Sequence, residues 1–207
     1  GSAYSALVLT PGRAVVSASP ELFFLQDGDR VETRPMKGTA PRGRWAEEDE
    51  RLAAELCVST KNRAENVMIV DLLRNDLGRI AETGSVHASP LFEIERYRTV
   101  WQMTSTVRGV TRRDPVDVLS CLFPCGSITG APKIRTMQII RDLEAAPRGV
   151  YTGAVGWIAP GRRACFNVAI RTVDIRGDGP DAAALREAGE ALRAGADAYV
   201  HTRAVRV

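Results

Sequence analysis

The sequence predicts an α+β protein in which antiparallel β-sheets are flanked by helices. Short apolar runs separated by turn residues occupy the first 36 positions and recur after residue 84, whereas the stretch between them has helical spacing. Strands and helices therefore come in blocks and do not alternate regularly, which is typical of the α+β class. With 44% apolar residues in 207, the chain can bury a substantial core.

The first 36 residues read as an antiparallel meander. The turn signals are TPGR at residues 10–13 and DGD at residues 27–29. The strand-like runs around them are residues 6–9, 14–17, 22–25 and 30–35.

Residues 46–81 read as helical, with acidic residues in the first turns and a polar break near Ser59 that divides two helices. Gly78 marks the expected end of the second helix. Residues 84–111 return to strand character. Asp114 is then an expected N-cap, followed by Pro115 at the first position of a helix.

The second half ends in a predicted hairpin. A loop over residues 124–133 leads into a helix over residues 134–144. Residues 149–159 and 163–175 are expected to pair across the turn PGR. After residue 177 the chain becomes rich in Ala, Arg and Gly, and its middle is expected to form a helix.

Composition argues against several classes of protein. The net charge of +3 is weak and dispersed, so no nucleic-acid partner is expected. No apolar run reaches membrane-spanning length and no signal peptide is present, so no membrane partner is expected either. The four cysteines form no CxxC pair, and His87 and His201 stand alone, which favours reduced thiols in a cytoplasmic protein over a zinc site.

Three short features could carry chemistry. Lys37 is one of only three lysines, and in the stretch PMKGT it is either a solvated turn residue or, if desolvated, a nucleophile. The segment GSITGAPK, residues 126–133, is either a plain helix start or an anion site. Asn62 and Glu65 are three apart on a helix, where they could share a cation or simply face solvent.

Six motifs in order, from about Tyr4 to Val173, resemble the chorismate-utilising enzymes, in particular the large subunits (component I) of aminodeoxychorismate synthase. The motifs are SPELFF, PMKGTAPRG, KNRAENVMIVDLLRNDLGRI, LFEIERYRTVWQMTSTV, FPCGSITGAPKIRTMQIIRDLE and RGVYTGAVGWI with NVAIRTV. The resemblance implies a partial chorismate-binding fold of the anthranilate synthase component I type over residues 1–175. Residues 176–207 are expected to be a divergent tail.

The resemblance also implies the catalytic residues. Glu21 would be the general acid for the departing hydroxyl of chorismate. Lys37, sixteen residues later, would be the nucleophile that attacks the ring, and ammonia would then displace it to give 4-amino-4-deoxychorismate, on the para-aminobenzoate branch of folate synthesis. Anthranilate synthases carry alanine at the position of Lys37, which favours the para-aminobenzoate branch.

Further implied roles concern substrate, metal and partner. Glu65 matches one magnesium ligand of the family, whereas Asn62 stands where the family has an acidic residue. Mg²⁺ and a glutamine amidotransferase that supplies ammonia are the expected cofactor and partner. The expected substrate-binding residues are Gly38, Thr39, Ser127, Thr129, Tyr151 and Arg171, with Arg171 holding a substrate carboxylate.

Alternatives remain open from sequence. The chain could belong to an anthranilate or isochorismate-type synthase, or be a truncated, non-catalytic remnant. The glycine-rich strand expected after Arg171 is not found. Glu187 and Glu190 are three apart, and they are either shifted counterparts of two further magnesium ligands or part of an unrelated tail.

Overall fold

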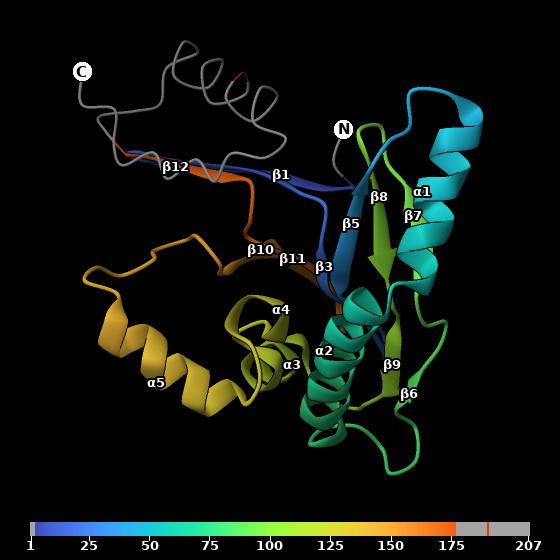
Figure 1. Ribbon diagram of the computed structural model, residues 1–207. Helices are drawn as coiled ribbons and strands as arrows, with labels where there is room; N and C mark the ends of the chain where they lie inside the picture. The colour runs from blue at the N-terminus through green and yellow to red at the C-terminus, as the bar shows by residue number, and fades with distance from the viewer. Residues whose placement is uncertain (1–2, 177–189, 191–207) are drawn as a thin grey trace. The chain divides into compact units, whose positions relative to one another are not determined.

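The computed structural model describes residues 3–176 and residue 190. The chain divides into two compact units. The first unit comprises residues 1–22, 148–157 and 166–207, and the second comprises residues 23–147 and 158–165. Mixed helices and antiparallel sheets confirm the predicted α+β class (Figure 1). The predicted helix of the tail lies outside the described residues, apart from Glu190.

The first unit contains a three-stranded antiparallel sheet. Strand β2 (Arg13–Ser19) is central, between β1 (Tyr4–Thr10) and β12 (Thr172–Arg176). The turn at residues 10–13 joins β1 and β2 as the sequence predicts. The guanidinium of Arg13 donates to the Asp174 carboxylate at 2.7 Å, which ties β2 to β12.

The second unit contains a six-stranded sheet in the order β10-β11-β3-β4-β9-β6 and a three-stranded sheet in the order β5-β8-β7. Strands β10 and β11 contribute their hairpin end, residues 158–165, to this unit. The strand bounds are β3 Leu22–Asp27, β4 Arg30–Arg34, β5 Met36–Pro41, β6 His87–Ala88, β7 Glu93–Arg96, β8 Val100–Thr104, β9 Val107–Val110, β10 Ala154–Ala159 and β11 Arg163–Val168. The helix bounds are α1 Ala46–Val58, α2 Thr60–Gly78, α3 Pro115–Leu122, α4 Gly126–Thr129 and α5 Lys133–Leu143.

Two predicted strand arrangements are wrong. The first 36 residues do not form one meander, because β2 pairs with β1 and β12 whereas β3 lies in the six-stranded sheet. The single strand predicted over residues 163–175 is divided into β11 and β12. Arg171 has φ of 48°, a left-handed conformation that interrupts an extended strand.

Helix α2 lies centrally in the second unit. Its start confirms the predicted break, because the Ser59 hydroxyl accepts a hydrogen bond from the backbone N–H of Asn62 at 3.4 Å. It packs against β5, β9 and α3. Its buried residues repeat at helical spacing: Asn66, Ile69, Val70, Leu73, Asp76 and Leu77. None of the helices within residues 3–176 is long and apolar enough to cross a membrane.

A polar cluster holds the start of α1 against β8. One oxygen of the Asp49 carboxylate accepts hydrogen bonds from Arg42 Nε, the Gly43 N–H and Trp101 Nε1, each at 2.8 Å. The guanidinium of Arg42 also lies 4.8 Å from the centroid of the Trp101 ring, within cation–π range. This cluster fixes the chain where β5 gives way to α1.

We predict that Gly43→Ala destabilises the protein. A Cβ at this position would lie 2.2 Å from the backbone nitrogen of Asp49, and backbone cannot move aside as a flexible side chain can. Overpacking of this kind lowers the free energy of unfolding by about 1–3 kcal/mol or more, which urea denaturation would measure. Gly78→Ala is the matched control, because no atom lies within 4 Å of its added Cβ. Equal stability of the two variants would contradict the packing argument.

We predict that Asp49→Asn destabilises the protein in a pH-dependent way. Hydrogen bonds from Arg42 first, then from Gly43 and Trp101, hold the pKa of Asp49 well below its usual range, against the opposing effect of burial. This stabilisation is present above the unfolded-state pKa of about 4 and is lost as pH falls through the folded-state pKa. In thermal melts, the Tm of wild type should therefore exceed that of Asp49→Asn at pH 7. This difference in Tm should become smaller below about pH 4. A difference that is constant with pH would contradict the ionic origin.

Candidate active site

Lys37 projects from an irregular strand. The pairing of β5 with β8 shifts register between Met36 and Thr39, and such a bulge redirects the side chains at its position. The Lys37 side chain is partly buried, and its Nζ donates to the backbone carbonyl of Ser127 at 2.9 Å. Within the described residues Lys37 forms no salt bridge. Its amine is thus held by a neutral acceptor.

The backbone of Lys37 is supported by a buried polar chain. The Asn66 side-chain amide donates to the Lys37 carbonyl at 3.5 Å, and its own oxygen accepts from the Ser105 hydroxyl at 2.6 Å. The Ser105 hydroxyl in turn accepts from the N–H of Phe92 at 3.0 Å. Asn66 and Ser105 are fully buried. Neither residue was predicted from the sequence, although an asparagine on the apolar face of a helix is a signal for such a role.

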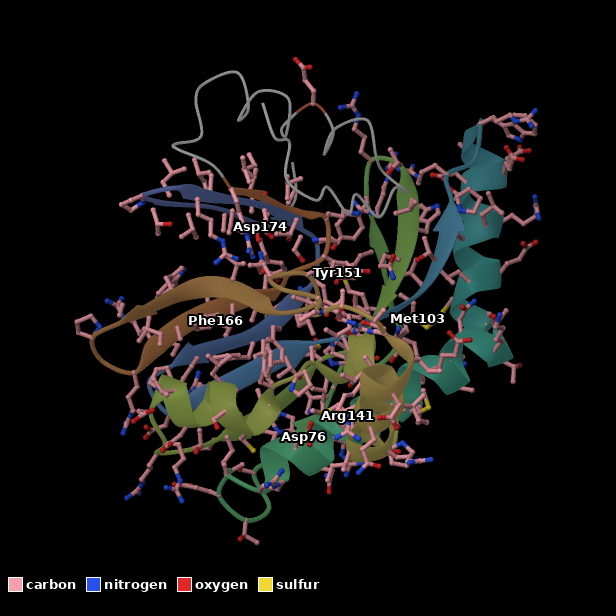
Figure 2. The ribbon with its side chains drawn as sticks, turned by 90° about the vertical axis from the view of Figure 1, so that its left-hand side faces the viewer. Asp76, Met103, Arg141, Tyr151, Phe166 and Asp174 are labelled. Atoms are coloured by element: carbon pink, nitrogen blue, oxygen red, sulfur yellow. The ribbon has the colours of Figure 1, made fainter. Side chains whose placement is uncertain are left out.

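Gly38 and Thr39 continue the same strand. Gly38 has φ of +100°, and a Cβ there would lie 3.0 Å from Cβ of Asn62 and 3.2 Å from Cβ of Met103, the β8 residue labelled in Figure 2. Glycine therefore allows β5 to approach α2 closely. The Thr39 hydroxyl donates to the Gln102 side-chain oxygen at 2.8 Å. Their predicted contact with substrate stays a prediction.

The segment after α3 brings Ser127 to Lys37. Ser127 lies in the short helix α4, and its carbonyl, not its hydroxyl, contacts the lysine. The Ser127 hydroxyl lies 3.3 Å from Sγ of Cys125, and the Thr129 hydroxyl donates to the Cys125 carbonyl at 3.1 Å. A Cβ on Gly126 would lie 2.3 Å from Cδ2 of Leu72, so α4 sits directly on α2. The two hydroxyl groups of this loop thus contact the loop itself, whereas the Ser127 carbonyl faces Lys37.

Glu21, Tyr151 and Arg171 belong to the first unit. Glu21 is 5% exposed, its N–H donates to the Ser19 hydroxyl at 3.2 Å, and its carbonyl accepts from the N–H of Val168 at 3.1 Å. Tyr151, which is labelled in Figure 2, is half-buried, and Arg171 is exposed. The carbonyl of Arg171 accepts from the N–H of Ala18, so β2 anchors the backbone of this residue.

Only some of the expected metal ligands lie among the residues that the structure describes. Glu65 is exposed on α2, and its carboxylate lies 4.0 Å from Nζ of Lys61. The Asn62 amide donates to the Ser59 hydroxyl at 2.9 Å, and within the described residues its oxygen has no hydrogen-bond partner. Within residues 3–176 no cluster of three or more His, Cys, Asp or Glu side chains could hold a metal ion. Glu187 lies outside the described residues, whereas Glu190 is exposed.

Relatives of known name cover most of this chain. A component 1 of aminodeoxychorismate synthase from Bacillus subtilis is 47% identical over 174 residues, which is 83% of this chain and 37% of the relative. A component 1 of anthranilate synthase from Haloarcula marismortui is 48% identical over 172 residues, 82% of this chain and 35% of the relative. The chain thus spans little more than a third of the length of these relatives. Overall identity does not separate the two activities.

The fold matches a solved relative. The crystal structure of anthranilate synthase component I from Streptococcus pneumoniae superposes with a TM-score of 0.77 at 34% identity, over 93% of this chain and 45% of that one. This confirms the predicted chorismate-binding fold. The family model for chorismate binding enzymes matches residues 1–192. On this match and these identities, the chain belongs to the family of chorismate-binding enzymes.

Proposed function

We propose that the protein containing this chain aminates chorismate to 4-amino-4-deoxychorismate. The observation that carries the proposal is the placement of Lys37: a partly buried amine, redirected by a strand bulge and oriented by the Ser127 carbonyl. A nucleophilic lysine needs a fixed direction and an available nitrogen lone pair. A backbone carbonyl supplies the direction without a counter-ion. The relative from Bacillus subtilis, named aminodeoxychorismate synthase, is in keeping with this reading.

In the proposed reaction Lys37 and Glu21 act in sequence. The amine nitrogen of Lys37 forms a bond to the ring while the carbon–oxygen bond of the substrate hydroxyl breaks. The buried carboxyl of Glu21 donates the proton with which that hydroxyl leaves as water, and acid assistance of this kind is worth about 100- to 10,000-fold. Ammonia then forms the second carbon–nitrogen bond, and the amine of Lys37 departs. One water is released for each ammonia consumed.

The two carboxylates of chorismate need positive partners. The exposed guanidinium of Arg171 can bind one of them with two parallel hydrogen bonds. Magnesium commonly binds through one or two protein carboxylates together with substrate oxygens, and Glu65 is accessible for this role. When bound there, Mg²⁺ would neutralise substrate charge. Gly38, Thr39, Ser127, Thr129 and Tyr151 remain the proposed lining of the substrate site.

Ammonia is proposed to come from a glutamine amidotransferase partner. Both relatives described above are named as a component 1, a designation given to one part of a multi-component enzyme. Within this chain we assign no residue to glutamine hydrolysis. Free ammonium at high concentration should therefore replace the partner in an assay.

The position of amination is the first test. The intact protein, incubated with chorismate, Mg²⁺ and ammonium, is expected to give the 4-amino product, identified by chromatography against authentic standards. The relative named anthranilate synthase, at 48% identity, makes ortho amination the second candidate. Formation of anthranilate would replace our proposal with that one. Absence of any amination by a folded, chorismate-binding protein would overturn both.

The second test examines the proposed role of Lys37 as the nucleophile. Lys37→Ala is expected to lower kcat by about 1,000-fold or more, because it removes the nucleophile. Lys37→Arg keeps the positive charge but should be equally inactive, because a guanidinium is not a nucleophile. Intact-mass spectrometry during turnover should show a substrate adduct on wild type and on neither variant. Arg141→Ala, at an exposed position of α5 (Figure 2), is the control and should retain activity. Undiminished turnover by Lys37→Ala would remove the assigned role.

A further inference from the structure

We infer that Lys133 and Asp76 are positioning residues that close the loop of residues 123–132 and thereby set the Ser127 carbonyl against Lys37. The catalytic meaning of this inference rests on the proposed role of Lys37. Its structural content, a loop held in one place by a buried ion pair, stands independently. All the groups involved belong to the second unit.

The ion pair joins both ends of the loop to α2. The Nζ of Lys133 donates to Asp76 Oδ2 at 2.5 Å and to the carbonyl of Leu122 at 2.9 Å. Leu122 is the last residue of α3 and Lys133 is the first of α5, so a single ammonium group bridges the two ends of the loop. The side chains of Lys133 and Asp76 are only 11% and 7% exposed.

Asp76 is itself anchored. It lies on the buried face of α2, where Figure 2 labels it, and its carbonyl accepts from Sγ of Cys121 in α3 at 3.1 Å. A carboxylate buried to this extent requires a charged or hydrogen-bonded partner. Lys133 meets that requirement, so the start of α5 is held at one point on α2.

The middle of the loop is held by a second contact. Gly126 lies so close to Leu72 that an added Cβ would be 2.3 Å from its Cδ2. With its ends held by Lys133 and its middle resting on α2, the loop has little freedom to move Ser127. The Ser127 carbonyl consequently remains within 2.9 Å of Nζ of Lys37.

Packing of α5 into the core does not account for the pair. None of the residues of α5 is buried, so this helix contributes little to the core. An ion pair that served only to attach α5 would be a costly way to secure a surface helix, because buried charges must first lose their hydration. Its geometric effect falls on the loop, which contains a group that contacts Lys37.

The test separates stability from positioning. In the intact protein, Lys133→Met and Asp76→Leu are each expected to lower thermal stability, because each leaves a buried polar group without its partner. The double variant Lys133→Met/Asp76→Leu should regain stability, since two apolar side chains can replace a buried pair. In the double variant, however, the Leu122 carbonyl lacks the hydrogen bond that the Lys133 ammonium donates in wild type. We therefore expect faster amide hydrogen exchange at residues 126–130 with unchanged protection in α2, and kcat reduced by about 10-fold or more at similar KM.

Two further variants complete the design. Arg141→Gln/Asp142→Asn removes an exposed ion pair from the same helix and should change neither exchange nor kcat. Lys133→Gln is expected to show the same faster exchange should the double variant not fold, because its shorter, uncharged side chain cannot replace the ammonium that bonds both Asp76 and the Leu122 carbonyl. Wild-type exchange at residues 126–130 in the folded variants would overturn the inference, as would a return of kcat together with stability. If wild type makes no aminated product the proposed function fails, whereas hydrogen exchange still decides whether the pair holds the loop.

Discussion

The buried face of α2 is the constraint on which the second unit depends. Ile69, Leu73 and Leu77 lie on it at helical spacing and are almost fully buried, and each is worth about 1.5–3 kcal/mol of transfer free energy. Asn66 and Asp76 interrupt this apolar stripe and are buried as well. Rotating α2 by a single residue, about 100°, would expose the apolar side chains and separate both polar groups from their partners. The core therefore sets the rotation of the helix, and the rotation sets the candidate site.

Burying Asn66 and Asp76 has a cost that only specific partners offset. An unpaired buried polar group costs about 1–3 kcal/mol, and more if charged. Asn66 is satisfied by the Ser105 hydroxyl and the Lys37 carbonyl, and Asp76 by Lys133. Alternative packings that lose these bonds are disfavoured for the same reason. The polar contacts thus select one arrangement of β5 and of the loop before α5 among those that apolar packing alone would allow.

Local signals in the sequence predict elements well but predict their partners poorly. The helix break at Ser59 and the N-cap at Asp114 follow from local hydrogen-bonding chemistry, and both are confirmed. Turn residues show where strands end but not which strands pair, so the separation of β2 from β3 was not foreseen. The contact between the Ser127 carbonyl and Lys37 was not predicted, because a backbone group leaves no trace in residue type. The helical spacing of Asn66 and Asp76 could have marked them as buried, but not their partners, which are distant in the sequence.

Lys37 and Lys133 both contact backbone carbonyls in or beside the loop of residues 123–132, but their other contacts differ. Lys133 donates to the Leu122 carbonyl and also meets a full negative charge on Asp76, so its amine belongs to an ion pair that attack on a substrate would have to break. Lys37 donates to the Ser127 carbonyl, and within the described residues no carboxylate forms a salt bridge with it. Carbonyl acceptors orient an amine without binding it as a counter-ion would. The difference between the structural Lys133 and Lys37, the proposed nucleophile, therefore lies in the single carboxylate that α2 presents to one of them and not to the other.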